Sequence, residues 1–575
     1  MDGDIKNREK NRLREIGVDG IVSIIILIIV SPYLFKLKVP YLNTDEFGYW
    51  GSAAFFAGYD WSSVISPNSY FSYGYGIFLA LILRFVKEPI LCFKAAILLN
   101  AFFIIGLYLT LKKIIYILYE NIEYKVCCLI SIISTFYCTI ITYSGITIPE
   151  CLLSFLYSIN VYLLLLFFKK PTWKKALGII SLSLYMYVVH QRMIVFLIVN
   201  VLFTIGYLYI KLDDNKIRTS IRFVFLLIFF CILFKEIEEI KKLLQREVWL
   251  IQESNVVISN DFSGQVSKVK YLLTHEGIRE FVYCVGGRIF YLIVSTYGLI
   301  ISFIISFMKI YRKKEISNNF KFLYYYLLLS MFGTIAVSCI FVYKPASTTY
   351  LFYGRYGDNI MPLIILILCL MIGNVSNKLF YISIFLINTL AILLKYRIDK
   401  VGLPNHNTSV SHVAMHIYYN EKGLNIFTCV LFVSLIFSLV FMILKYGRKE
   451  WIIIPGIIYM IGSIYVGYHA TEIFYEEEQI ADIEDALEIA YTIKELNIRE
   501  VDVLVRDIEI LGKKDKYGKI IQFVNPEIKI YIKNETEKCD SYFIKHNEGE
   551  KTNDEFTIIK ENEKYMLAKY EKVGE

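Results

Sequence analysis

Residues 151–168 read CLLSFLYSINVYLLLLFF, an apolar run without a charged side chain. A run of this length approaches the roughly 20 residues that cross a hydrocarbon core about 30 Å thick. Similar runs recur along nearly the whole chain, among them IVSIIILIIV at 21–30 and MPLIILILCLMIG at 361–373. The chain has 575 residues, 56% of them hydrophobic, and a mean hydropathy of +0.50. These values exclude a water-soluble globular protein and predict an α-helical polytopic membrane protein.

The apolar runs and the basic clusters between them predict a topology. We expect about thirteen spans, near 18–36, 90–111, 126–143, 150–168, 176–190, 193–210, 221–235, 288–308, 322–343, 359–374, 379–396, 424–445 and 451–468. The tract KNREKNRLR precedes the first run, and no small-residue cleavage site follows that run, so an uncleaved span is predicted. The basic clusters place the N-terminus in the cytoplasm and the C-terminus outside. A further apolar segment, 72–85, is predicted to be a short juxtamembrane or re-entrant helix.

The chain therefore divides into a cytoplasmic segment (1–17), a transmembrane region with external loops (18–470) and a soluble extracytoplasmic α/β domain (471–575). In the last region, EQIADIEDALEIAYTIKEL carries apolar residues at helical spacing, and short strand-like runs follow it. Structural capping is the expected role of this domain, with substrate or partner recognition as the alternative. Most of the 11 cysteines lie inside apolar runs, so no disulfide is predicted. Abundant isoleucine, lysine, asparagine and tyrosine are typical of an AT-rich bacterial genome.

The segment YLNTDEFGYW at 41–50 places two acids, Asp45 and Glu46, just after the first predicted span. A carboxylate at the membrane surface can take a proton from an acceptor hydroxyl, and a second can tune its pKa, hold a cation or orient the acceptor. Adjacent residues do not share a helix face, so the two acids are expected to have separate roles. A solvated loop with ordinary acids is the alternative.

Two further polar positions interrupt apolar runs on the same predicted face. Glu150 follows Pro149, which suits the first turn of a helix, and there it could also contact a substrate or a cation. His190 and Arg192 form a turn in which arginine offers donors to phosphate oxygens, while the histidine donates a hydrogen bond or, when protonated, adds charge. A helix-start acid and an interfacial arginine are the structural alternatives.

The segment YLFYGRYGDNIMP at 350–362 sets Arg355 between Tyr353 and Tyr356, just before a predicted span. The arginine is a second candidate anion ligand, and the tyrosines could pack on a sugar or prenyl chain or form part of an interfacial belt. Possible further cations are Lys268, Lys270, Arg279 and Arg288.

Histidines recur in the segment HNTSVSHVAMH, and His412 and His416 would be neighbours on a helix. Such a pair can bind a metal. A loop with incidental histidines is the favoured interpretation, so no metal site is assigned, and the involvement of a divalent cation is left open.

Together these features resemble the GT-C superfamily of membrane glycosyltransferases, with protein O-mannosyltransferases and lipid A aminoarabinose transferases as the nearest types. The shared features are an uncleaved first span, the external acid pair and an exterior C-terminal domain. Three short motifs are shared as well: Pro149-Glu150 at an external tip, HQR at 190–192 and GRY at 354–356. The resemblance covers about residues 15–470.

The resemblance implies a donor sugar carried on a polyprenyl phosphate, with Asp45 as the catalytic base and Glu46 in the second position of the pair. Arg355 and Arg192 would hold the donor phosphate, and the sugar would move with inversion in one displacement. At 66–76 the chain reads SPNSYFSYGYG, where better-known members have a stretch of a hydrophobic residue followed by Pro-Pro-Leu. This departure leaves the acceptor open: it could be a glycan, a lipid or a protein. The expected setting is the bacterial cell envelope, with the lipid bilayer as a partner and no nucleic acid.

Two other functions compete with this interpretation. A transporter or flippase of a lipid-linked glycan would also be polytopic, but it usually places ionisable residues near the bilayer midplane and shows repeats or broken helices. A non-catalytic membrane scaffold with an exterior recognition domain is the third reading, and it predicts that Asp45→Asn changes no assay.

Overall fold

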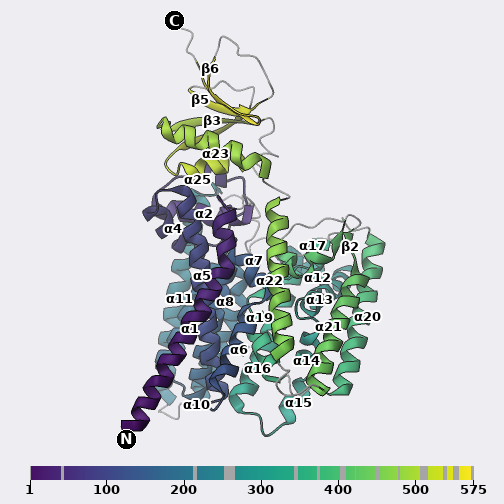
Figure 1. The fold of residues 1–575 in the computed structure, drawn as a ribbon. Coiled ribbons are helices and arrows are strands. Elements are labelled where there is room, and N and C mark those ends of the chain that lie inside the picture. The colour runs from purple at the N-terminus through teal and green to yellow at the C-terminus, as the bar shows by residue number, and fades with distance from the viewer. Residues whose placement is uncertain are drawn as a thin grey trace.

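The computed structural model describes residues 2–40, 44–211, 216–251, 266–341, 348–371, 376–401, 410–420, 423–446, 453–476, 480–505, 516–534, 541–547 and 556–570. These residues form a large helical bundle with a small α/β domain on one end (Figure 1). The N-terminus lies at the opposite end of the bundle from that domain (Figure 1). The expected fold class, a polytopic α-helical region followed by a C-terminal α/β domain, is confirmed.

The bundle begins with α1 (Asp2–Lys36), α2 (Thr44–Ala57), α3 (Ser62–Ile65), α4 (Gly74–Phe85), α5 (Pro89–Leu118), α6 (Tyr124–Thr135), α7 (Cys138–Ser144), α8 (Glu150–Lys169), α9 (Trp173–Val189), η1 (Gln191–Met193), α10 (Ile194–Lys211) and α11 (Lys216–Glu247). It continues with α12 (Val266–Leu272), α13 (His275–Ser295), α14 (Leu299–Ile305), α15 (Phe307–Arg312), α16 (Asn318–Phe341), α17 (Thr348–Leu351), α18 (Arg355–Asp358), α19 (Met361–Met371), α20 (Asn377–Val401), η4 (Val410–Tyr418), β1 (Tyr419–Asn420), β2 (Gly423–Leu424), α21 (Ile426–Tyr446) and α22 (Ile453–Glu476).

Eight helices of the described residues are long and apolar enough to cross a membrane, and the bent pair α6–α7, which turns by 65°, would make nine. The chain is therefore a multi-pass membrane protein. The expected count of thirteen spans is not confirmed. Two of the predicted spans correspond to shorter elements: α9 has 17 residues and α19 has 11. The short helix expected at 72–85 is present as α4, whose 12 residues are too few to cross a bilayer.

The expected span at 288–308 is wrong, and so is part of the long loop expected at 236–287. The helix α13 begins at His275 and ends at Ser295, where Tyr297 and Gly298 adopt left-handed backbone conformations with φ of 48° and 85°. A left-handed glycine is a common way to end a helix. The apolar run therefore divides between α13 and the short helices α14 and α15. Upstream, α11 extends to Glu247, so the predicted loop begins later than expected.

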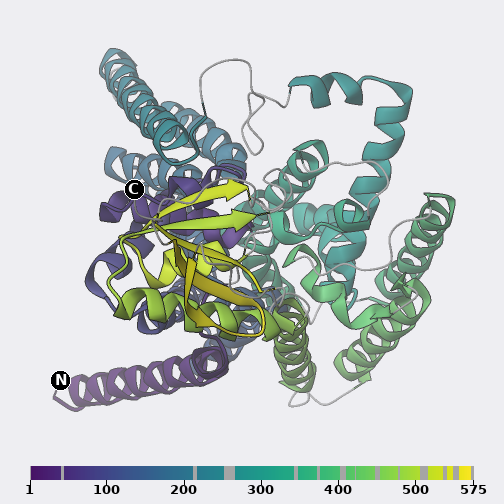
Figure 2. The same cartoon turned by 90° about the horizontal axis from the view of Figure 1, so that it is seen from above.

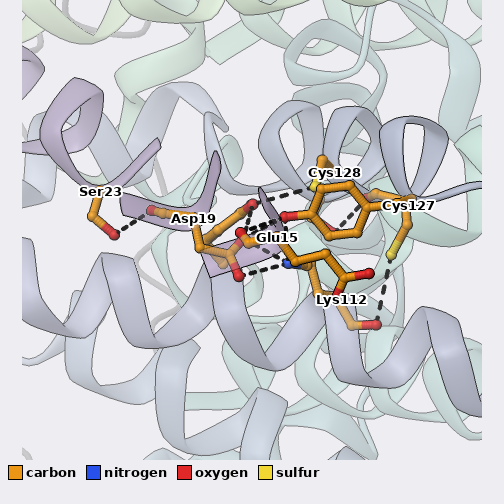
Figure 3. A network of polar contacts seen from close by, with 9 residues as sticks. Glu15, Asp19, Ser23, Lys112, Cys127 and Cys128 are labelled. Carbon is orange, nitrogen blue, oxygen red and sulfur yellow. Dashed lines mark hydrogen bonds and ion pairs between the residues drawn. The ribbon is translucent and has the colours of Figure 1, made fainter. Parts of the chain in front are cut away.

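An ion pair between Asp19 and Lys112, whose side chains are 25% and 8% exposed, joins α1 to α5 (Figure 3). The ammonium of Lys112 lies 2.5 and 2.8 Å from the two carboxylate oxygens of Asp19. Tyr108 donates to the same carboxylate at 2.8 Å, and Tyr124 donates to the carbonyl of Glu15 at 2.8 Å. These contacts fix α1 against α5 and α6 with a closed set of polar partners.

The C-terminal domain contains α23 (Ile480–Glu495), β3 (Glu500–Val505), α25 (Lys516–Val524), β4 (Lys529–Asn534), β5 (Tyr542–His546), β6 (Phe556–Glu561) and β7 (Tyr565–Tyr570). Its five strands lie in the order β4-β3-β5-β7-β6. Strand β3 runs parallel to both β4 and β5, whereas β7 runs antiparallel to β5 and β6. The crossover from β3 to β4 through α25 is a βαβ unit, which places α25 on one face of the sheet.

The domain is seated on the N-terminal half of the bundle through aromatic contacts from α25. Phe523 meets the ring of Trp50 edge-on at 5.1 Å between centroids, and it also contacts Trp61 at 6.4 Å. The indole nitrogen of Trp61 donates to the carbonyl of Pro526 at 3.1 Å. Seen from above, the domain leaves the teal and green helices of the middle of the chain uncovered (Figure 2).

Candidate active site

The guanidinium of Arg355 lies at the centre of a buried ion-pair cluster. Its Nη1 donates to Asp45 Oδ2, and its Nε donates to Glu150 Oε1 at 2.5 Å. Arg192 approaches the same oxygen of Glu150 with its Nη2 at 3.3 Å. The fold thus brings together two acids and two arginines that the sequence singled out in four separate segments.

Each of these four side chains lies at the beginning of a helix. Asp45 is in the first turn of α2, Glu150 is the first residue of α8, Arg192 is in η1, and Arg355 is the first residue of α18. The first amides of a helix have no intrahelical acceptor, so acids are stabilised there. The site is therefore built from helix ends at the end of the bundle that carries the α/β domain (Figure 1).

The cluster is closed to solvent except at one member. The side chains of Glu150, Arg192 and Arg355 are 1%, 2% and 3% exposed, whereas that of Asp45 is 36% exposed. Burial alone would lower the pKa of Arg355, but the carboxylates of Glu150 and Asp45 hold it well above its usual value. Arg355 therefore remains charged. Asp45 is the acid that an incoming molecule could reach.

The second acid of the pair points away from this cluster. Glu46 is fully buried, and its Oε1 accepts the backbone N–H of Thr147 at 2.6 Å and the hydroxyl of the same residue. The indole of Trp50 donates to the Thr147 hydroxyl at 2.8 Å. Neighbouring residues of a helix point about 100° apart. Glu46 therefore fixes α2 to the turn before α8, while Asp45 faces Arg355.

Aromatic side chains surround Arg192. Its guanidinium lies 4.8 Å from the ring centroid of Tyr356, and that ring meets Tyr353 edge-on at 5.1 Å. His190 contacts Tyr356 at 5.7 Å, and its Nδ1 accepts the backbone N–H of Arg192 at 3.3 Å. Burial, Arg192 and Arg355 together hold the pKa of His190 well below its usual value. The lowered pKa favours the neutral imidazole, and because Nδ1 accepts a hydrogen bond, its hydrogen then lies on Nε2. Of the two roles expected for His190, the hydrogen-bond donor is the one that fits this environment.

Sequence reasoning missed a further buried acid, Asp358. Its carboxylate accepts the hydroxyls of Tyr137 at 2.9 Å, Tyr143 at 2.8 Å and Tyr291 at 3.4 Å. Burial raises the pKa of Asp358 to about 6, although the hydrogen bonds from Tyr143 and Tyr137 oppose that change. Asp358 shares the four-residue helix α18 with Arg355, so its three tyrosine contacts hold the helix that presents the central guanidinium.

Gly354, just before Arg355, is the sequence feature that could have indicated the close packing of α13 against this segment. A Cβ on Gly354 would lie 1.9 Å from Cε1 of Tyr291, so no larger residue fits without moving that ring. The Gly354 N–H donates to the carbonyl of Ser411 at 2.9 Å. A glycine inside an aromatic motif thus marks the close approach of α13 to the segment that carries the arginine.

The histidine segment does not extend this site. His412 and His416 are buried in the 3₁₀ helix η4, and His406 lies outside the described residues. Within the described ranges, no three His, Cys, Asp or Glu side chains gather closely enough to hold a metal ion. Of the possible further cations, Arg279 pairs with Glu276 on the surface of α13 at 3.3 Å.

Comparison with known proteins finds similarity among solved structures. No protein-family model matches the chain, and no curated protein matches it. Among solved structures, the chain is similar to ArnT from Cupriavidus metallidurans in the apo state, with 9% sequence identity, a TM-score of 0.47, and coverage of 96% of this chain and 97% of ArnT. The structure of the same protein bound to undecaprenyl phosphate gives the same identity and TM-score, with coverage of 96% and 98%.

Proposed function

We propose that the chain is a membrane glycosyltransferase that moves a sugar from a polyprenyl phosphate to an acceptor hydroxyl, with inversion and with Asp45 as the general base. The observation that carries the proposal is the contact of one arginine, Arg355, with both Asp45 and Glu150, beside Arg192. A proton acceptor and two anion ligands are the groups that such a displacement needs.

Asp45 suits the role of base because it is the accessible acid of the cluster. Its ion pair with Arg355 orients the carboxylate, and 36% of its side chain remains exposed. Glu150 is 1% exposed and its Oε1 contacts both arginines, so it suits the role of orienting the arginines rather than receiving a proton. The two carboxylates therefore differ in access, and that difference assigns their roles.

The reaction follows from competition for Arg355. The phosphate of the donor would accept hydrogen bonds from Arg355 and Arg192, and in doing so it would weaken the hold of Arg355 on Asp45. The released carboxylate then takes the proton of the acceptor hydroxyl as that oxygen bonds to the anomeric carbon. The bond from the anomeric carbon to the phosphate oxygen breaks, and the polyprenyl phosphate leaves with its charge held by the arginines.

The other predicted site residues have supporting roles in this proposal. Tyr353 and Tyr356 provide ring faces for the sugar or the first prenyl units, and neutral His190 offers its Nε2–H as a donor. Glu46 keeps α2 in place through Thr147. No step requires a divalent cation.

The division of the chain at about residue 470 also belongs to the proposal. The bundle holds the ionisable residues of the site, and the C-terminal domain packs on α2, the helix that carries Asp45. We assign this domain a capping role: Phe523 supports Trp50, which in turn contacts Thr147. On this reading the site and the domain face the extracytoplasmic side, and the N-terminus lies in the cytoplasm.

Transfer by the purified chain tests the proposal. Deletion of the gene, followed by mass spectrometry of surface glycans, identifies the missing sugar and its acceptor. The detergent-solubilised protein is then supplied with that sugar on a polyprenyl phosphate. We expect inverted product from the unaltered chain, and a loss of turnover of about 10²–10⁴-fold in Asp45→Asn, the range for removal of a general base.

Asp60→Asn is the matched control, because Asp60 is an exposed acid of the same region whose Oδ1 only accepts the N–H of Ser62, at 3.0 Å. This variant should keep full transfer. Unchanged transfer by Asp45→Asn, with a normal elution profile and unfolding midpoint, would overturn the mechanism.

A further inference from the structure

A third buried arginine, Arg288, lies beside the site without a carboxylate partner among the described residues. It is 2% exposed, and its Nε donates to the hydroxyl of Ser338 at 3.1 Å. Its two terminal nitrogens, Nη1 and Nη2, are buried and have no hydrogen-bond acceptor in the described chain. Glu280, an acid two turns earlier on α13, is engaged by Arg397 at 2.5 Å. Among the described residues, the guanidinium therefore has two buried nitrogens without an oxygen acceptor.

An arrangement of this kind is costly for the folded protein. An unpaired buried charge destabilises a protein by several kcal/mol, and replacing it by an apolar residue often restores stability. Besides the Ser338 hydroxyl, the polar groups near Arg288 are the thiols of Cys284 on α13 and Cys339 on α16, which offset the cost of its burial only in part. A thiol is a weak hydrogen-bond acceptor. Stability of the fold therefore does not explain an arginine at this position, and a role in binding a ligand does.

Arg288 is adjacent to the segment that carries Arg355. Its guanidinium lies 5.1 Å from the ring centroid of Tyr353, and Tyr353 contacts Tyr356, the ring beside Arg192. Tyr291, one turn later on α13, donates to Asp358. Arg288 and Arg192 thus lie on the two sides of one tyrosine pair.

Arg192 also has guanidinium nitrogens without an acceptor among the described residues. Its Nε and Nη1 are buried and have no acceptor in the described chain, although Nη2 reaches Glu150. Two buried guanidinium groups with free donors, separated by aromatic rings, form a pattern suited to a ligand that carries anions at two places and a sugar between them.

We propose that Arg288 is an anion-binding residue, and that one substrate of this site carries a second anionic group, a phosphate or a carboxylate, besides the lipid phosphate. The identity of the molecule that carries this group rests on the proposed function, but the binding of an anion at Arg288 does not. The group belongs either to the acceptor or to the sugar of the donor.

Thermal unfolding of the full-length protein in detergent, titrated with inorganic phosphate, tests the anion site. The titration is made on the Arg192→Met variant, so that the other free guanidinium does not contribute. We expect a saturable rise in the unfolding midpoint. Adding Arg288→Met should weaken phosphate binding at least tenfold, and Arg288→Lys should give an intermediate value because it keeps the charge without the two-donor fork.

Arg279→Met is the matched control, since Arg279 is half exposed on the same helix and, unlike Arg288, has carboxylate partners, exposed Glu276 and buried Glu280. It should change phosphate binding less than twofold. The unfolding midpoint of Arg288→Met without phosphate is the second readout: a binding arginine leaves it unchanged or higher, whereas a purely structural arginine lowers it. A phosphate response that survives in Arg288→Met, or no saturable response before that change, would overturn the proposal.

Undecaprenyl phosphate then separates the second anion from the lipid phosphate. Its dissociation constant should rise at least tenfold in Arg192→Met and stay within twofold in Arg288→Met. An equal loss in both variants would mean that Arg288 holds the lipid phosphate, and the claim of a second anionic group would fail. With the reaction reconstituted, a higher KM for the acceptor in Arg288→Met assigns the anion to the acceptor, and a higher KM for the donor assigns it to the sugar.

Failure of undecaprenyl phosphate to bind any variant would count against the proposed function and leave the phosphate titration intact. The two proposals can therefore fail separately.

Discussion

The bundle contains two buried networks of charged side chains, and they differ in whether the protein completes them. Around Asp19, both carboxylate oxygens accept a hydrogen bond from Lys112 (Figure 3). Around Arg355, Glu150 Oε2 and two nitrogens of Arg192 have no partner in the described chain. Both networks are buried charges in a membrane protein, where such groups are costly.

The difference separates a structural network from a binding network. Native proteins leave few buried polar groups unpaired, so unpaired groups that gather in one place need an explanation. A structural role is enough to explain the burial of Asp19 and Lys112, because their ion pair joins α1 to α5. The arginines around Glu150 hold more donors than their protein partners use, and a substrate phosphate would use them.

The largest effect is expected from removing the shared arginine. Arg355→Met takes away the donor of both acids, so we expect transfer to fall by at least about 10²–10³-fold, the cost of removing one charge-stabilising donor. Stability should fall by about 3–5 kcal/mol, because Glu150 stays buried with a single arginine. Transfer assays and denaturant unfolding measure the two effects.

Arg355→Lys sharpens this prediction. Lysine keeps the charge but cannot present two donors in a fixed fork, so it should recover part of the stability and little of the transfer. Normal transfer by either variant would contradict the central role of Arg355.

A smaller and purely structural effect is expected at the other network. Asp19→Asn leaves the ammonium of Lys112 buried without its counter-charge, and Asp19 itself is 25% exposed. We therefore expect a loss of about 3 kcal/mol, the low end of the range for breaking a buried pair. Transfer per folded molecule should stay unchanged. The double variant with Lys112→Met should recover part of the lost stability, and additive losses would contradict the pairing.

The sequence made part of this site predictable. Asp45, Glu150, Arg192 and Arg355 stood out because each interrupts or borders an apolar run, where a charge is rare and helix ends meet. The separate directions of Asp45 and Glu46 followed from helix geometry. These inferences used only the spacing of residues within one segment, and that spacing determines the directions of the side chains once the segment forms a helix.

The remainder depended on contacts between distant segments. Tyr137, Tyr143 and Tyr291 read as ordinary membrane tyrosines, and their convergence on Asp358 follows from the packing of α7, α13 and α18. The end of α13 was missed for a related reason. A left-handed turn at Gly298 interrupts an apolar run that hydropathy alone treats as continuous.

The last expected effect is on stability alone and depends on pH. It comes from the titration of Asp358, which lies in the helix of Arg355 and accepts hydrogen bonds from three tyrosines. Its pKa rises with burial from the usual 3.8 to about 6, so the folded protein binds this proton more tightly than the unfolded chain does. Stability from this group is therefore greatest below about pH 4, falls as the pH rises to about 6, and is constant above it. The total change is about 3 kcal/mol, from about 1.36 kcal/mol for each pKa unit.

Asp358→Asn cannot titrate and keeps an oxygen that accepts from the tyrosines, so the difference between its stability and that of the unaltered chain should grow in favour of the variant between pH 4 and 6. Unfolding midpoints of both proteins over pH 4–8 measure this difference, with Asp60→Asn as the exposed control. Parallel curves would mean that Asp358 titrates as an ordinary acid. The three tyrosines would then stabilise its charge as completely as water does, and the helix of Arg355 would be held at no cost in free energy.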